Sequence, residues 1–334
     1  MTEVRNEQKP AQPLPWHADI WAQWSQQLHD DRLPHALLIT GLPGLGKRTL
    51  ARALAHRLLC EAPQGPHACG HCEACQMMAA GFHPDWHQLS PEAEGKALKI
   101  DQIREMTLQV QQSAQRGGHK LVLIWPAEAM NLYAANALLK TLEEPEPRTQ
   151  FVLVSDQPSS LPATLRSRCQ HWKVQPPPLS QGQDWLAHQL SEDQCPQQLL
   201  KAAGGRPLQA LKMARPEQEQ QRQLLYEALD RLTRDAEVTE VASQLKSLPL
   251  ADCLDSLQNW LADSLRYTLF AEAGVQDVRQ LPLYQQWHAL MSVRQRIKLD
   301  LDCRQARLGL KQNPNPELFI ENLLISLTKE LGHE

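Results

Sequence analysis

A glycine-rich stretch has the composition of a phosphate-binding loop. It contains Gly41, Gly44 and Gly46, followed at once by Lys47. Glycines in such a loop let backbone N–H groups point at phosphate oxygens, and the lysine reaches the β- and γ-phosphates. An apolar run precedes the stretch and an amphipathic segment follows it, which is the strand–loop–helix context that the motif requires. The sequence therefore predicts a P-loop, and these four residues are the candidate nucleotide-binding residues.

Two positions at which hydrolysis needs metal chemistry carry unsuitable residues. The residue after the lysine, where a hydroxyl should hold Mg²⁺, is Arg48. Thr49 is one residue out of register, which turns its side chain by about 100° on a helix. A later strand-like run ends in Trp125 where an acidic residue is expected, and Glu128 beyond it is expected to be solvated. We expect this loop to stabilise a strand–helix turn without hydrolysing ATP. The sequence does not decide whether the loop binds nucleotide.

Four cysteines lie within a short segment of the chain. Cys60, Cys69, Cys72 and Cys75 have the spacing C-x8-C-x2-C-x2-C. Pairs spaced C-x2-C can place two thiolates on one tetrahedral zinc ion. Four thiolates would close the site to water, so the spacing predicts a structural zinc knuckle rather than a catalytic metal.

Other potential ligands in the chain are expected to have no metal role. Two histidines near the knuckle are expected to be bystanders, and four scattered cysteines are expected to be small core residues. These residues are His67, His71, Cys169, Cys195, Cys253 and Cys303.

Composition narrows the classes of function. The chain has 334 residues, which predicts two or three domains, and its net charge of -4 argues against a protein that coats DNA alone. No apolar run is long enough to span a bilayer, and the first fifteen residues have no apolar segment of a secretory signal. We therefore expect a cytoplasmic protein with no membrane partner, whose thiols stay reduced.

A short tripeptide after the third strand-like run could act on a neighbouring molecule. Ser167, Arg168 and Cys169 follow one another there. An arginine at the edge of an ATPase domain can reach the γ-phosphate bound by an adjacent subunit. The alternative interpretation is a surface arginine beside a serine that caps a helix.

The elements expected in the first half alternate between strand and helix, which predicts a parallel α/β sheet covered on both faces. The expected strands are 35–40, 85–89, 120–125 and 151–155, and the expected helices are 17–28, 47–60, 100–115 and 132–142.

Beyond Pro176–Pro178 the chain is expected to be all-α. The predicted helices cover 179–190, 197–203, 208–214, 219–232, 249–269, 283–301 and 317–331. We expect three domains: a P-loop domain with the knuckle over 1–173, a small helical lid over 174–214, and a helical collar over 215–334.

Five sequence elements together resemble the bacterial clamp-loader family of AAA+ proteins. They are His35-Ala-Leu-Leu, the loop 41–47, the cysteine knuckle, the helix Ala135-Asn-Ala-Leu-Leu-Lys-Thr-Leu-Glu-Glu-Pro145, and Leu165-Arg-Ser-Arg-Cys169. They occur in the order found in that family and cover roughly the first half of the chain. The resemblance implies an AAA+ P-loop domain followed by a lid and a collar domain that holds a ring together.

Departures from the active members of the family indicate which kind of subunit this is. An Asp-Glu pair of those members corresponds to Trp125 and Pro126, and an arginine of their lid corresponds to Leu208. Arg168 is kept, with Ser167 beside it. The pattern is similar to that of a subunit that does not hydrolyse ATP but offers an arginine in trans. The resemblance implies neither polymerase nor ATPase activity of its own.

The resemblance also implies partners. They are the delta and gamma/tau subunits of the DNA polymerase III clamp loader, the sliding clamp, and primer–template DNA. Two alternatives remain. One is a hydrolysing AAA+ subunit of the same complex, in which Thr49 and Glu128 replace the missing groups. The other is a free-standing zinc-dependent DNA-binding adaptor, which the P-loop and the net charge disfavour.

Overall fold

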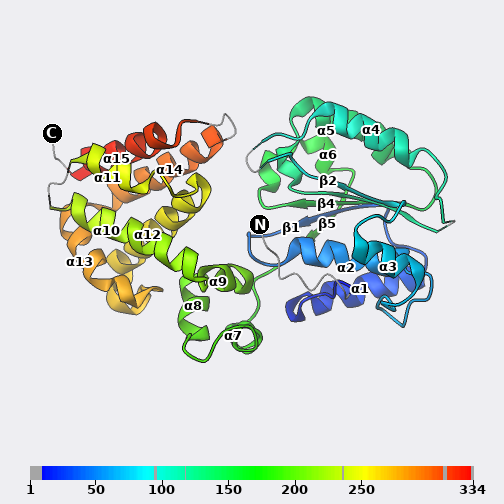
Figure 1. Ribbon diagram of the computed structural model, residues 1–334, viewed down its shortest axis with the longest axis horizontal. Helices are drawn as coiled ribbons and strands as arrows, with labels where there is room; N and C mark the ends of the chain where they lie inside the picture. Colours follow the sequence, from blue (N-terminus) through cyan, green and yellow to red (C-terminus); the bar gives the residue numbers. More distant parts are fainter. Residues whose placement is uncertain (1–9, 94–95, 117, 235–236, 311–313, 332–334) are drawn as a thin grey trace. The chain divides into compact units, whose positions relative to one another are not determined.

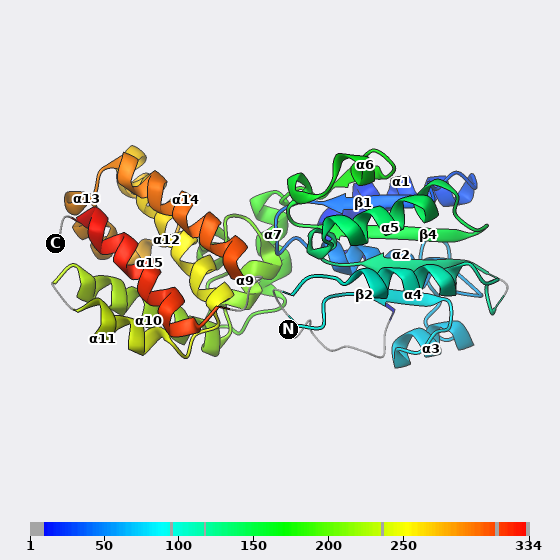
Figure 2. The same ribbon diagram turned by 90° about the horizontal axis from the view of Figure 1, so that it is seen from above.

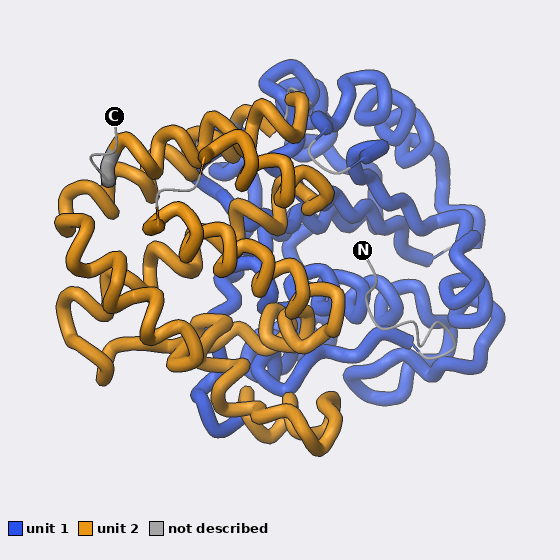
Figure 3. Tube along the Cα trace, turned by 60° about the vertical axis from the view of Figure 1, so that its left-hand side comes forward, with its two compact units in different colours: residues 1–181 blue, residues 182–334 orange. Residues whose placement is uncertain are grey.

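The computed structural model describes residues 10–93, 96–116, 118–234, 237–310 and 314–331. The chain separates into two compact units, residues 1–181 and 182–334 (Figure 3). Each unit has its own apolar core and is described by itself.

The first unit is built on a five-stranded parallel sheet with strand order β2-β3-β4-β1-β5 (Figure 1). The strands are β1 (Ala36–Thr40), β2 (Trp86–Leu89), β3 (Lys120–Ile124), β4 (Thr149–Ser155) and β5 (Gln170–Lys173). Every residue of β1, β3 and β4 is buried, as expected for strands covered on both faces.

Helices cover both faces of this sheet. In Figure 1, α1, α2 and α3 lie on one side, and α4, α5 and α6 lie on the other. Leu37 and Ile39 of β1 join the core formed with α1 and α2, whereas Ala36 and Leu38 join the core formed with α4 and α5. The predicted α/β sheet is therefore confirmed.

The helices of the first unit begin and end as follows: α1 (Ala18–His29), α2 (Lys47–Leu59), α3 (Glu73–Ala80), α4 (Ile100–Val110), α5 (Leu132–Glu143) and α6 (Ala163–Arg166). Short 3₁₀ turns are η1 (Pro15–His17), η2 (Ala127–Ala129) and η3 (Pro158–Ser160).

The described chain beyond Pro178 is helical. Its helices are α7 (Leu179–Ala187), α8 (Pro196–Ala202), α9 (Pro207–Met213), α10 (Pro216–Leu232), α11 (Val238–Leu245), α12 (Leu250–Phe270), α13 (Leu281–Leu290), α14 (Val293–Gly309) and α15 (Pro316–Leu331). The 3₁₀ turns η4 (Ala271–Gly274) and η5 (Val278–Gln280) join α12 to α13. Within the second unit, α14 packs against both α12 and α15, and all three helices run side by side in Figure 2. None of the helices in the described residues is long and apolar enough to cross a membrane.

The described residues of the second unit form two separate apolar clusters. A small one gathers Leu186, Leu200 and Met213, and a large one surrounds Trp260 and Trp287. A further division of the chain at residues 174 and 214 into lid and collar stays a prediction.

Several predicted elements differ from the observed ones. The predicted helix 283–301 is two helices, because Ser292 begins α14 with a capping box in which its hydroxyl accepts from the N–H of Gln295. The predicted helix 100–115 ends at Val110. The sequence did not predict strand β5 or the helices α3, α6 and α11.

Candidate functional site

The ends of three strands bring the candidate residues of the phosphate loop together. Strand β1 lies beside β4, with Thr40 opposite Ser155, and β3 lies on the other side of β4. Gly41, Trp125 and Asp156 are the residues that follow these three strands. The carboxyl edge of a parallel sheet is where such folds bind ligands.

Backbone geometry explains the first glycine of the loop. Gly41 has φ +144°, and a Cβ atom on it would lie 2.5 Å from the carbonyl oxygen of Val174. Gly44 and Gly46 have φ of 83° and 75°, in the left-handed region that favours glycine. Gly46 is also the residue from which α2 starts. The predicted strand–loop–helix turn is present.

The loop lysine is buried and fully engaged within the chain. Lys47 is only 4% exposed. Its Nζ atom donates to the carbonyl oxygens of Gly41 and Leu42, at 2.8 and 2.6 Å, and lies 2.5 Å from Oδ1 of Asp156. The sequence interpretation did not single out Asp156. Its place directly after a fully buried strand was the signal that could have found it.

The two residues that replace the metal-organising groups contact each other. The guanidinium carbon of Arg48 lies 4.6 Å from the ring centre of Trp125, which is cation–π geometry. Neither side chain supplies an oxygen ligand for Mg²⁺. The two residues that depart from a working ATPase loop therefore pack against each other.

The expectation that Glu128 is solvated is wrong. Its Oε1 atom accepts a hydrogen bond of 2.9 Å from the backbone N–H of Asp156, and its other carboxylate oxygen is buried. The cause is the short turn η2, which directs Glu128 back toward the end of β4. Glu128 thus positions the residue that pairs with Lys47.

The N-terminal segment holds the loop from outside. Trp16 Nε1 and His17 Nε2 both donate to the carbonyl oxygen of Leu45, at 2.9 and 2.8 Å. The backbone N–H of Leu14 donates to Nδ1 of His17, so the neutral tautomer with its proton on Nε2 satisfies both contacts. Burial lowers the pKa of His17 to about 4.

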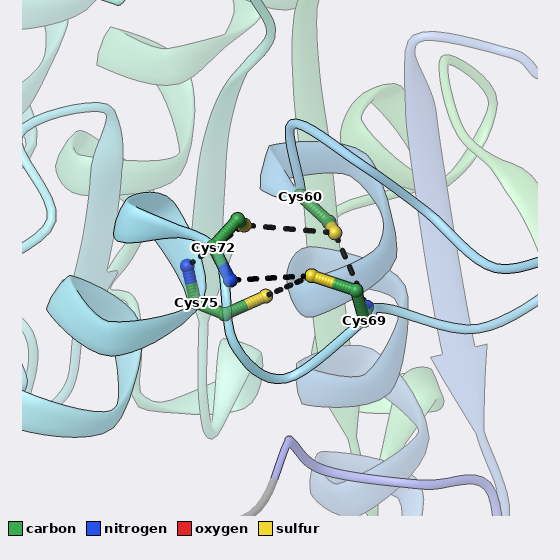
Figure 4. A group of neighbouring side chains, drawn as sticks. All are labelled: Cys60, Cys69, Cys72 and Cys75. Atoms are coloured by element: carbon green, nitrogen blue, oxygen red, sulfur yellow. Dashed lines mark hydrogen bonds between the residues drawn. The ribbon is translucent and has the colours of Figure 1, made fainter.

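The four cysteines predicted as a knuckle come together (Figure 4). Their sulfur atoms all lie within 4.8 Å of one another, with Cys60 and Cys72 at 3.8 Å and Cys69 and Cys75 at 3.9 Å. Ligands about 2.3 Å from a tetrahedral ion are roughly 3.8 Å apart, so this group can hold a zinc ion.

Hydrogen bonds from the backbone lower the pKa values of three of these thiols, whereas burial raises them. The pKa of Cys69 is lowered to about 6, first by a hydrogen bond from the backbone of His71. Burial raises the pKa of Cys60 and of Cys75. A bound cation would favour the thiolate form of all four.

The nearby histidines have other contacts. The ring of His67 stacks on Trp21 of α1, with ring centres 5.8 Å apart, and His71 Nδ1 lies 2.9 Å from the carbonyl oxygen of Cys69. Among the scattered cysteines, Cys169, Cys253 and Cys303 are buried as expected. The prediction for Cys195 is wrong, because that residue is exposed at the start of α8.

Arg168 follows α6 in the chain, and its side chain contacts Glu143, the last residue of α5. Its Nε atom donates to Glu143 at 2.6 Å, its Nη2 atom also contacts Glu143, and its Nη1 atom donates to the carbonyl oxygen of Thr164 at 2.8 Å. The hydroxyl of Ser167 donates to the same carbonyl oxygen at 3.1 Å. The side chain of Arg168 is 33% exposed, so it remains accessible from outside the chain.

A parallel sheet whose first strand leads through this glycine loop into α2 defines a P-loop α/β protein with altered metal-organising positions. The model of the family described as "DNA polymerase III, delta subunit" matches residues 16–178. The DNA polymerase III subunit delta' of Pseudomonas aeruginosa is 38% identical, over 81% of this chain and 83% of its own length. The corresponding protein of Yersinia pestis is 35% identical, over 93% of this chain and 94% of its own length. The chain therefore belongs to the family of DNA polymerase III delta-prime subunits.

A more distant match is the DNA polymerase III subunit tau of Salmonella typhimurium. It is 33% identical over 48% of this chain and 25% of its own length. The two kinds of subunit are thus similar over part of their sequences.

Proposed function

We propose that this chain is the non-hydrolysing subunit of a bacterial clamp loader. It joins the delta and gamma/tau subunits of DNA polymerase III and helps to load the sliding clamp on primer–template DNA. Its membership of the delta-prime family supports this assignment. The protein has no polymerase activity and no ATPase activity of its own, and it acts in the cytoplasm.

The contact between Arg48 and Trp125 carries the claim that the chain does not hydrolyse ATP. A working loop needs a hydroxyl and an acidic residue to organise Mg²⁺ and the attacking water. Here a cation stacked on an indole ring lies where those groups would act.

The alternative of a hydrolysing subunit requires Thr49 and Glu128 to take over these roles. Glu128 instead accepts a hydrogen bond from the backbone of Asp156, and Thr49 stays one residue beyond the magnesium-ligating position. These observations favour the non-hydrolysing assignment. The alternative of a free-standing DNA-binding adaptor is disfavoured by the match to delta-prime subunits over most of the chain.

Arg168, with Ser167 beside it, is the group that this subunit offers to its neighbour. We assign Arg168 as an arginine finger that reaches the ATP bound by an adjacent gamma/tau subunit. The geometry of the exposed ion pair with Glu143 supports this role. Exposed pairs contribute only about 0.2–1 kcal/mol, so a γ-phosphate can compete for the guanidinium.

The cysteine cluster and the helical unit have supporting roles in this proposal. The cysteines hold a structural zinc ion, and the collar joins the subunits of the ring. The four sulfur positions support the zinc assignment.

An ATPase assay of the purified full chain, alone and mixed with gamma/tau and delta, tests the proposal. The chain alone is expected to release no phosphate above the buffer rate, and the mixture is expected to show hydrolysis stimulated by clamp and primed DNA. ATP turnover by the chain alone that disappears in Lys47→Ala would contradict the proposal.

A further inference from the structure

The ammonium group of Lys47 is already paired with an anionic group of its own chain, the carboxylate of Asp156. In a nucleotide-binding P-loop the ammonium group contacts phosphate oxygens. Here Lys47 is only 4% exposed, and its ammonium group has three oxygen partners from its own unit. They are two backbone carbonyls and the carboxylate of Asp156. These partners match the three donors of an ammonium group.

We propose that Asp156 is a built-in substitute for a phosphate group, and that it keeps this loop closed to nucleoside triphosphates. The inference concerns a residue outside the proposed arginine contact and does not depend on the role of Arg168. It explains how a chain can keep the glycines and lysine of the motif without binding nucleotide.

Charge supports the exclusion. A triphosphate entering the loop would approach the carboxylate of Asp156 and the carboxylate of Glu128, which is anchored to the Asp156 backbone. It would also have to take Lys47, which is only 4% exposed, from a carboxylate partner 2.5 Å away whose side chain is 32% exposed. Like charges and a lost ion pair both oppose binding.

Hydrogen bonds from the chain itself fix several carbonyl groups of the loop backbone. Trp16 and His17 fix the carbonyl of Leu45, and the lysine itself fixes those of Gly41 and Leu42. Neutralising Asp156 should therefore expose a formed phosphate site rather than a collapsed one.

Titration of the purified full chain with ATP, with and without Mg²⁺, tests the proposal. The unaltered protein is expected to show no saturable binding at up to about 1 mM ATP. Asp156→Asn, which removes the charge and keeps the size, is expected to bind ATP at least ten times more tightly than the unaltered protein. Adding Lys47→Ala to that variant should abolish the binding. Asp184→Asn, the same change at an exposed position of α7, is the matched control and should behave as the unaltered protein.

Two outcomes would overturn the proposal. One is tight ATP binding by the unaltered chain, and the other is an affinity of folded Asp156→Asn within twofold of the unaltered protein. Asp156→Ser provides a second variant if the amide does not fold. If neither folds, thermal unfolding of Lys47→Met with and without Asp156→Asn decides. The proposal requires the second change to raise the melting temperature of Lys47→Met, because it removes a partly buried carboxylate that has lost its cation. A further fall would contradict it.

Discussion

At the scale of single residues, the altered P-loop consists of compensating changes rather than isolated losses. Arg48 places a cation beside the loop, and Trp125 gives it a π face. Lys47 would be a buried charge without its phosphate, and Asp156 neutralises it. The sequence alone identified the missing metal ligands, but not the partners that made their loss tolerable, because such pairs depend on which strand ends are adjacent.

Buried histidines give the fold a predictable dependence on pH. Burial lowers the pKa of His17 and of His56 from 6.5 to about 4. The unfolded chain binds these protons first as pH falls, so stability is present above pH 6.5 and is lost progressively toward pH 4. Between pH 7.5 and 5 we expect the two histidines to reduce the free energy of unfolding by on the order of 2–4 kcal/mol.

Thermal or urea unfolding across this pH range measures the effect. His17→Gln should lower stability at pH 7.5, because two hydrogen bonds are disturbed, but it should reduce the slope with pH. His83, His87 and His119 also have pKa values lowered by burial and act in the same direction. A melting temperature that stays constant from pH 7.5 to 5 would show that these side chains are not buried as described.

At the scale of elements, the cysteine segment is expected to be a metal-dependent local structure on a metal-independent sheet. Cys60 ends α2, and Cys72 begins α3 with its sulfur accepting from the N–H of Cys75. Protein purified under reducing conditions should contain about one zinc per chain. Cys72→Ser should release it and speed hydrogen exchange in 60–80, while β1 and β4 stay protected.

The exposed Cys195 offers a matched control for this prediction, since it lies outside the cluster. Cys195→Ser should keep the metal and the exchange pattern. The idea fails if elemental analysis of the reduced protein finds no metal. Loss of all sheet protection in Cys72→Ser would contradict the local role assigned to the cluster.

Which elements could be predicted depended on how much of each strand or helix is apolar. The runs that became β1, β3 and β4 are almost continuously apolar because both faces are covered, so they were identified from the sequence. Strand β5 has only Trp172 as a large apolar residue and is defined by pairing with β1 at the sheet edge, which no local pattern reveals. The helix α3 begins inside the cysteine segment, where ligand spacing hid its periodicity.

At the scale of the whole molecule, the proposed function depends on a contact that this chain alone does not contain. Arg168 pairs with Glu143, and both side chains are partly exposed. Two roles are then possible: the arginine stabilises its own domain, or it leaves this pair to contact a neighbour's nucleotide. The two roles predict effects of different size on stability and on the rate of hydrolysis, so they can be distinguished. The exposed pair contributes at most about 1 kcal/mol, whereas arginine fingers raise rates by roughly 10³–10⁵ in other nucleotide hydrolases.

Arg168→Ala is therefore expected to change activity far more than stability. The isolated chain should lose no more than about 3 °C in melting temperature and should still assemble with gamma/tau and delta. ATP hydrolysis stimulated by clamp and primed DNA should fall at the affected site by at least about tenfold, and clamp loading should fall with it. Arg168→Lys should restore little, because a flexible ammonium lacks the planar fork that meets two phosphate oxygens.

Two further variants decide between the roles of Arg168. Glu143→Gln removes the charge of its partner but keeps the guanidinium, so a complex containing it should retain stimulated hydrolysis if Arg168 acts in trans. If Arg168 only braces the end of α5, Glu143→Gln should lower melting temperature and activity as Arg168→Ala does. Arg104→Ala removes another exposed arginine of the same unit, one that lies near Asp101 on α4, and should leave the complex unaffected. Full stimulated hydrolysis by an assembled complex carrying Arg168→Ala would exclude the finger role, because hydrolysis would then proceed without the guanidinium group.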